Sequence, residues 1–346
     1  MTTDIALWLI QDGIVNGAIY ALLALALLLV FAVTRAIFVP QGEFISYAAL
    51  SLALLQTGKL PGTVFVLVIG GCAAAAMESY VALRERAFGR LPRIVLLYLV
   101  LPLAMAAIAW WGAPRKLDLW AQVLIVLGLV VPLGPILYRI AYQPLANASV
   151  LILFIISMAA HYVLSGLGLV FFGGEGLRSE PFSDAKINVG VLDITAQSVW
   201  VVGASVVIMI ALWLFFEHTI YGKALRATAV NRIGARLVGI PTETSGSLSF
   251  LLAALIGAIS GILVSPITTI YYDTGFLIGL KGFVGGILGG MASYPLAAVG
   301  ALVLGLLESF SSFWASAYKE TIVFTLIIPI LIWRSLKTRH VEDEEE

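Results

Sequence analysis

Residues 14–34 read IVNGAIYALLALALLLVFAVT, an unbroken hydrophobic run without a charged side chain. About 20 helical residues span the hydrocarbon core of a bilayer, so this run is long enough to cross a membrane. Asp4 and Asp12 precede it, and no small-residue cleavage site of the kind that ends a signal peptide follows. We therefore expect a retained membrane anchor.

The composition of the whole chain supports this expectation. Of its 346 residues 61% are hydrophobic and 12% are charged, and the mean hydropathy is +1.03. Soluble domains carry roughly 25% charged residues, so this chain lacks the polar surface that water would require. Its 20 basic and 20 acidic residues balance, which argues against nucleic acid as a partner. A single cysteine, Cys72, excludes an intrachain disulfide and a multi-cysteine metal site.

Further hydrophobic runs predict an all-α polytopic integral membrane bundle of about 10–11 segments. Three of them, 43–56, 276–291 and 320–334, are short, so we expect tilted, half-helical or re-entrant structure there. Such backbone is tolerated at membrane depth only where protein or a watery cavity covers it. The candidate segments are 14–34, 43–56, 61–82, 94–111, 120–138, 150–171, 198–216, 247–264, 276–291, 296–311 and 320–334.

The distribution of Lys and Arg predicts the orientation. If all eleven runs cross, one side carries 13 of these residues and the other carries 6. The positive-inside rule then places the first side in the cytoplasm, with the N-terminus outside and the C-terminus inside. One re-entrant pair would leave this parity unchanged.

Two polar loops are long enough to bind partners, an outer loop at about 172–197 and an inner loop at 217–246. Good helix formers in the inner loop predict one surface helix from Lys223 to Val238, capped by Gly239 and ended by Pro241. Such a helix either lies on the membrane or docks into a partner protein. Its small or apolar stripe would comprise Ala224, Ala227, Val230 (or Asn231) and Gly234, with Arg226, Arg232 and Arg236 spread outward.

Ionisable side chains within hydrophobic runs are candidates for function, because each costs at least about 2.5–3.5 kcal/mol to insert. Glu43 either caps the helix that follows Pro40 or contacts a solute. For Glu78, near a helix end, we expect snorkelling to the surface. Lys281 and Glu308 are predicted to form a buried ion pair, with solute contact as the alternative. His161 is interpreted as a hydrogen-bonded packing residue rather than a proton relay.

Motifs for enzymatic chemistry are scarce. The sequence has no G-x-x-x-x-G-K-[ST] phosphate loop and no H-E-x-x-H metal motif, so we expect no enzyme activity, cofactor or metal site. Residues 203–206, GASV, fit the G-x-S-x of some intramembrane proteases, but so short a pattern is weak. Glycine pairs at four-residue spacing, such as Gly282 and Gly286, predict close helix packing, within the chain rather than between subunits.

Three blocks of the chain carry motifs of a known family. These blocks are residues 12–44, residues 222–243 (GKALRATAVNRIGARLVGIPTE) and residues 279–334. Two departures from the family's motifs occur. Asn231 stands where the family commonly has an acidic residue, and Pro40 and Gln41 replace the family's usual Ala-His. In their content and order the blocks resemble the branched-chain amino acid ABC transporter permeases of the LivH type. The matching positions are Asn16, Gly17, Tyr20, Ala21, Leu22, Gly42 and Glu43; Gly222, Arg226, Ala227, Ala235, Leu237, Gly239 and Ile240; and Lys281, Leu288, Gly289, Gly290, Ser293, Pro295, Gly305, Glu308, Tyr318 and Lys319.

The resemblance implies a non-enzymatic importer half in a bacterial inner membrane. Its partners would be a homologous permease or second copy, two cytoplasmic ATPases that hydrolyse the ATP, and a periplasmic solute-binding protein. Residues 217–246 would couple to the ATPases, and residues 1–340 would form the permease domain. The substrate path would contain Asn16, Tyr20, Gln41, Glu43, Lys281 and Glu308; ATPase coupling would involve Lys223, Arg226, Ala227, Asn231, Arg232, Ala235, Arg236 and Gly239.

The middle of the chain departs from the family pattern. Loops similar to the family's E-R-x-A-Y-R-P-L loop occur twice, at 83–93 and 138–149, so 94–138 is interpreted as an inserted helical hairpin. The final residues, VEDEEE at 341–346, are expected to form a solvated, disordered tail. A stand-alone secondary transporter is the alternative function. No motif distinguishes branched-chain amino acids from amides or aromatic acids as the solute.

Overall fold

The computed structural model describes residues 3–115, 117–189, 192–290 and 293–337. Every hydrophobic run predicted from the sequence coincides with helix in these ranges, which confirms the all-α polytopic fold class. Eight helical stretches among the described residues are long and apolar enough to cross a membrane. The predicted acidic tail at 341–346 lies outside the described residues, as do Lys116 and Arg339 from the charge distribution.

The described residues form long helices, composite helices, shorter helices and one β-hairpin. The long helices are α1 (Thr3–Thr34), α3 (Thr63–Arg84), α8 (Val150–Phe172), α9 (Ala196–His218), α12 (Thr242–Val264) and α14 (Tyr294–Trp314). Two long stretches are composite: α4 (Leu91–Val95) with α5 (Leu101–Gly112), and α6 (Leu119–Val130) with α7 (Leu133–Leu137). The shorter helices are α2 (Gln41–Gln56), α10 (Ile220–Val230), α11 (Arg232–Leu237), α13 (Thr274–Leu288), α15 (Lys319–Thr325) and α16 (Ile327–Lys337). An antiparallel hairpin joins β1 (Lys186–Val189) to β2 (Leu192–Thr195), with Lys186 opposite Thr195.

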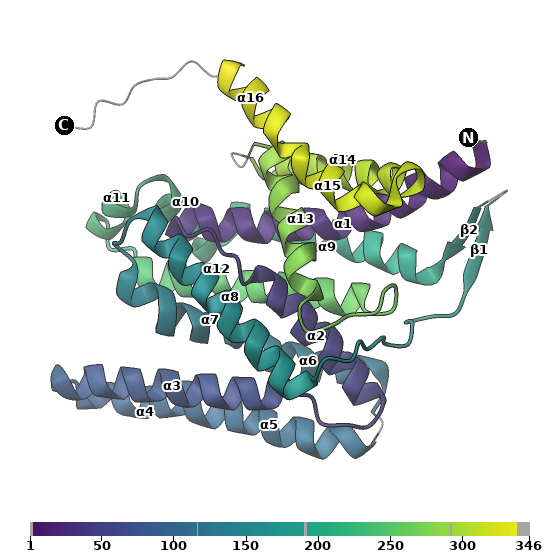
Figure 1. The fold of residues 1–346 in the computed structure, drawn as a ribbon. Helices are drawn as coiled ribbons and strands as arrows, with labels where there is room; N and C mark the ends of the chain where they lie inside the picture. Colours follow the sequence, from purple (N-terminus) through teal and green to yellow (C-terminus); the bar gives the residue numbers. More distant parts are fainter. Residues whose placement is uncertain (1–2, 116, 190–191, 291–292, 338–346) are drawn as a thin grey trace.

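The chain runs back and forth between two ends of the molecule (Figure 1). We call them the hairpin end, which holds β1, β2 and the start of α1, and the α11 end, which holds α10 and α11. The short α13 lies across the long helices near the middle of the molecule, and it runs from beside the start of α2 toward the start of α14. From there α14 runs antiparallel to α1, because Leu302 faces Gly17 and Leu306 faces Gly13. The short run predicted at 276–291 is thus helical over 276–288 and lies oblique to the long helices.

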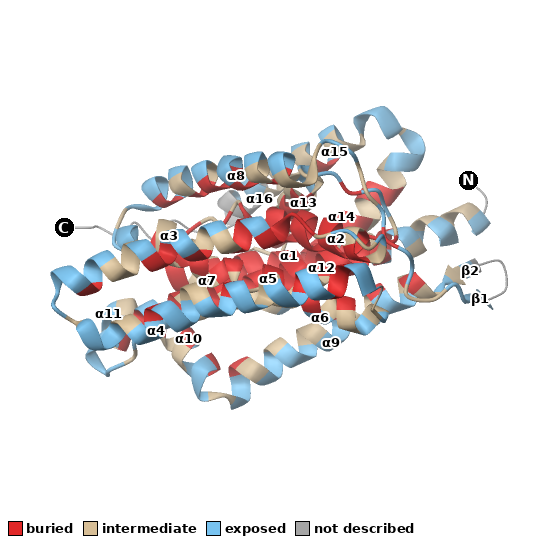
Figure 2. Cartoon of the chain, turned by 90° about the horizontal axis from the view of Figure 1, so that it is seen from below, coloured by how far each residue is buried: buried red, intermediate tan, exposed pale blue. Residues whose placement is uncertain are grey.

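Helix α1 is the centre of the bundle. Its apolar window is 89% buried, and Figure 2 shows the buried residues concentrated on α1, α2 and α12, while the outward faces of α8 and α9 are exposed. Small residues permit this packing, as small-x-x-x-small motifs do in membrane helices. A Cβ on Gly305 would lie 2.4 Å from the backbone nitrogen of Gly17, so only glycine allows α14 to approach α1 this closely. The glycine-rich stretches thus pack within the chain, as predicted.

The inserted hairpin predicted at 94–138 has two unequal halves. Its first half belongs to a layer of α3, α4 and α5 along one side of the molecule (Figure 1). Its second half, α6 and α7, packs against α2 and α12 in the core. The assignment of an insertion remains a prediction, and this packing shows that the two halves do not form one separable unit.

Candidate functional site

A buried charged cluster joins four helices on the side of α1 that faces α13 and α14. Lys281 on α13 donates to Glu308 Oε1 on α14 at 2.6 Å and to Glu320 Oε1 on α15 at 2.9 Å. The Tyr20 hydroxyl on α1 donates to the other Glu308 oxygen at 2.5 Å. The predicted Lys281–Glu308 pair is therefore present, with both side chains less than a tenth exposed.

This cluster lines a cavity of about 1010 Å³ that extends toward the hairpin end. Asn16 and Tyr20 from α1 line it together with Lys281 and Glu308, so four of the six residues predicted for a solute path come together here. Five carboxylates and four cations face the space, which makes it polar and nearly neutral in charge. These are Asp12, Asp184, Asp193, Glu308 and Glu320, with Arg178, Lys186, Lys281 and Lys319.

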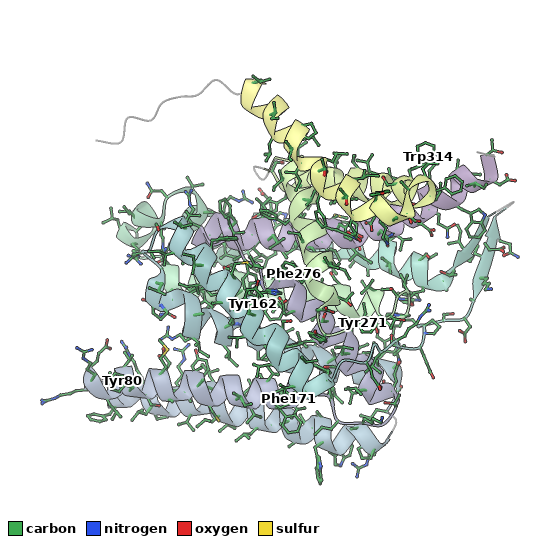
Figure 3. All side chains as sticks on the ribbon, viewed as in Figure 1. Tyr80, Tyr162, Phe171, Tyr271, Phe276 and Trp314 are labelled. Atoms are coloured by element: carbon green, nitrogen blue, oxygen red, sulfur yellow. The ribbon has the colours of Figure 1, made fainter. Side chains whose placement is uncertain are left out.

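Gln41 and Glu43, the other two predicted path residues, do not line this cavity. Glu43, in the first turn of α2, is 1% exposed and its Oε1 lies 2.6 Å from His161 Nδ1 on α8. Gln41 Nε2 donates to the Ala253 carbonyl of α12. Phe276 of α13 stacks on the His161 ring at a centroid distance of 4.4 Å, at the point where α13 crosses the bundle (Figure 3). The hydrogen-bonded packing role expected for His161 fits this geometry.

Glu320 is the residue of the cluster that sequence reasoning missed. It begins the short run 320–334 next to Lys319, a position that is typical of a solvated loop. The fold instead directs it to Lys281, and its second oxygen, Oε2, is buried without a hydrogen-bond partner among the described residues. The available signal was the presence of a carboxylate at the edge of a short, apolar segment.

The inner-loop helix predicted from Lys223 to Val238 as one element is two helices, so that prediction was wrong. Asn231 interrupts it with extended backbone (φ −150°, ψ 103°), and its side-chain oxygen caps α11 by accepting from the Gly234 N–H at 2.8 Å. Asparagine competes with helix continuation in this way because its short amide satisfies free N–H groups. Gly239 adopts a positive φ of 85° and ends α11, as predicted.

The predicted stripe of this loop is not the face that packs against the rest of the chain, and its docking role remains a prediction. The residues that bury α10 and α11 are Gly222, Leu225, Thr228 and Ala235 rather than Ala224, Ala227 and Val230. The break at Asn231 changes the phase of the helix, which shifts the inward face. Arg232, expected to point outward, donates to the Ala146 carbonyl at 2.6 Å, and Arg236 donates to Thr242.

Large apolar side chains of this loop remain exposed at the α11 end. Val230, Ile233, Leu237 and Val238 are 74–83% exposed. Basic residues flank them, with Lys223 exposed and the Arg226 side chain 54% exposed. Exposed apolar residues within a charged rim are typical of a protein interaction surface.

Glu78 was expected to snorkel to the surface, but its carboxylate is instead bound within the protein. It is held by two charge-assisted bonds from Arg139, through Nε to Oε1 and, at 2.5 Å, through Nη2 to Oε2. Arg139 also donates to Gln143, whose amide donates to Glu243 at the start of α12. These hydrogen bonds connect α3, through Arg139 and Gln143, to the start of α12. A count of charges along the sequence could not show this connection.

The fold and the buried polar cavity define a multi-pass α-helical membrane protein with a polar route into its interior. The family model for the branched-chain amino acid transport system permease component matches residues 9–331. The chain belongs to this family of transport permeases.

Similar curated proteins include the high-affinity branched-chain amino acid transport system permease protein LivH of Escherichia coli (strain K12), 30% identical over 201 residues. A second is the permease protein BraD of Pseudomonas aeruginosa, 28% identical over 206 residues, and a third is the probable LivH of Methanocaldococcus jannaschii, 32% identical over 225 residues. The matches cover 56%, 57% and 61% of this chain, and 65%, 66% and 68% of the respective relatives.

Proposed function

We propose that this chain is the membrane-embedded permease subunit of a binding-protein-dependent ABC importer for branched-chain amino acids or a related small solute. Membership of the permease family and the printed descriptions of its relatives support this proposal. The expected partners are a homologous permease or a second copy, two cytoplasmic ATPases, and a solute-binding protein at the hairpin end. The hairpin end would then face the periplasm of a cell with an inner membrane.

The observation that carries the ABC assignment is the exposed apolar surface of α10 and α11. Ile233 and Leu237 are 74% and 83% exposed although they belong to a loop with basic residues, at the end predicted to be cytoplasmic. An ATPase cleft would remove these side chains from water, which is favourable by about 25 cal/mol per Å² of apolar area.

The same loop is connected to the core, so motion of an attached ATPase could reach the solute path. Thr228 on α10 donates to Ser245 on α12 at 3.2 Å, and Arg232 binds the 143–149 loop. Helix α12 packs against both α1 and α2. In the proposed mechanism ATPase closure shifts α10 and α11, and α12 transmits the shift to α1, which lines the cavity.

The proposed solute path is the cavity beside Lys281, with Asn16, Tyr20 and Glu308 as further contacts. A volume of about 1010 Å³ is ample for a small organic solute. Gln41 and Glu43 would act at the crossing of α2 with α13, beyond the cavity. Selection of the solute is assigned mainly to the binding protein.

The test is Leu237→Glu, with Leu336→Glu as a control because both leucines are 83% exposed. The chain is co-expressed with the partner permease and ATPases, and ATPase co-purification is measured. We expect Leu237→Glu to reduce recruitment about tenfold or more, as loss of a buried interface leucine would, and the control to retain it. Unchanged recruitment, or solute uptake by the chain reconstituted without ATPase, would overturn the ABC assignment.

A further inference from the structure

A second cavity, of about 630 Å³, lies between α9 and α14 in the half of the molecule nearer the α11 end. Its floor is the C-terminal half of α1, where Leu25 and Leu29 are buried. Met209 and Trp213 from α9 form one wall, and Ala298 from α14 lies on the other. We call this space the α9–α14 groove.

The lining of the α9–α14 groove is almost wholly apolar. Arg226, from α10, is the one charged residue that lines it among the described residues. Helix α9 is long and apolar enough to span a membrane, and only 17% of its apolar window is buried, so this chain leaves most of its apolar surface uncovered. Water would gain little in such a groove, because it needs two to four polar partners to be held. Hydrocarbon is the medium that this lining matches.

The mouth of the groove, where Arg226 lies, has the polar groups that could bind the headgroup of a lipid. Arg226 Nη2 donates to the Phe216 carbonyl at 3.0 Å and to Glu217 at 3.1 Å, which fixes the guanidinium at the groove mouth. Its Nε and Nη1 donate to none of the described residues. Trp213, which also lines the groove, is 61% exposed, and tryptophan is enriched where hydrocarbon meets headgroups. A guanidinium with free donors is well suited to bind phosphate.

The geometry points to a phospholipid site: we propose that the α9–α14 groove holds an acyl chain of a phospholipid whose phosphate binds Arg226. A helix from another subunit fits less well. The Phe216 and Tyr294 rings stack across the groove at a centroid distance of 5.4 Å, which joins α9 to α14. A helix is about 10–12 Å wide with its side chains and would have to separate these rings, whereas an acyl chain would not.

The test measures bound lipid by native mass spectrometry of the full chain, delipidated and then titrated with phosphatidylglycerol or with a diacylglycerol of the same chains. Ala298→Phe fills the groove, and we expect it to abolish the specific binding of both lipids. Val299→Phe is the control on the same helix, because Val299 is 56% exposed and outside the groove. Equal lipid binding by Ala298→Phe and Val299→Phe would overturn the proposal.

Arg226→Gln tests the headgroup contact without altering the core. We expect about tenfold weaker phosphatidylglycerol binding, the effect of losing one charge-assisted hydrogen bond, and unchanged diacylglycerol binding. Arg90→Gln is the matched control, since Arg90 also pairs with a carboxylate, Glu85, at 3.1 Å. Equal effects of the two arginine substitutions would contradict phosphate binding at Arg226. Cross-linking of Ile210→Cys to a second permease chain, with no lipid retained, would instead make the groove a subunit interface.

Discussion

Lys281 is surrounded by carboxylates in the interior of a membrane protein. It is the shared donor for Glu308 and Glu320, while Tyr20 satisfies the remaining Glu308 oxygen. An ammonium group in this position stabilises α13 against α14 and α15, and it also faces the cavity proposed as the solute path. The residue can therefore have a structural role, a transport role, or both, and a substitution can separate them.

We expect Lys281→Met to destabilise the protein by about 3–5 kcal/mol, because two carboxylates would remain near each other without their cation. The double variant Lys281→Met/Glu308→Gln should regain much of this stability, since less buried charge is left unpaired. Thermal unfolding of the purified protein in detergent measures both effects. A single variant as stable as the parent would show that the cluster is solvated.

Transport by the double variant then distinguishes the roles of the cluster. If Lys281 contacts solute, uptake in the assembled importer stays low although stability recovers. If the pair only joins the helices, uptake recovers with stability. The residue predictions for Asn16, Tyr20, Glu308 and Lys281 as path residues depend on this comparison.

At the scale of elements, two short helices meet by backbone contact. Gly42 at the start of α2 and Gly275 at the start of α13 have no space between them: a Cβ on Gly42 would lie 2.1 Å from the Gly275 carbonyl oxygen. This contact allows α13 to cross the bundle and brings Phe276 onto His161. The crossing positions both the Glu43–His161 pair and the start of the helix that carries Lys281.

Gly42→Ala should therefore lower the free energy of unfolding by about 1–3 kcal/mol, the usual cost of overpacking. The obstructing atom belongs to the backbone, so no rotamer change can relieve the clash. Gly203→Ala on α9 is the control, because a Cβ there meets nothing within 4 Å. Equal melting temperatures for the two variants would show that α2 and α13 do not make this contact.

At the scale of the whole molecule, the alternation of the chain between its two ends predicts sidedness. The loop that contains Gly89 and the α10–α11 segment lie at one end, and the loop that contains Asp184 lies with the hairpin at the other (Figure 1). The excess of Lys and Arg predicts that the α11 end is cytoplasmic. This orientation remains a prediction, and labelling can decide it.

In a Cys72→Ala background, Asp184→Cys should react with a membrane-impermeant maleimide in intact cells, after removal of any outer barrier. Gly89→Cys should react only after the membrane is permeabilised. Both positions are exposed, so access and not burial decides the result. The reverse pattern would invert the proposed orientation, and labelling of both in intact cells would contradict the alternation between them.

The sequence by itself determined the fold class, the positions of the hydrophobic segments and the family. These properties reside in local hydropathy and in motifs, and lipid demands helices wherever a long apolar run occurs. It also predicted the Lys281–Glu308 pair, because charged residues at membrane depth need partners.

Only the tertiary structure decided which distant groups meet. Tyr20 and Glu308 are 288 positions apart, and Glu43 meets His161 from 118 positions away. The same holds for Glu320 beside Lys281 and for Arg139 beside Glu78. Such pairings depend on how helices cross, and crossing angles follow from the packing of side chains on several helices at once. Hydropathy along a single chain does not contain that information.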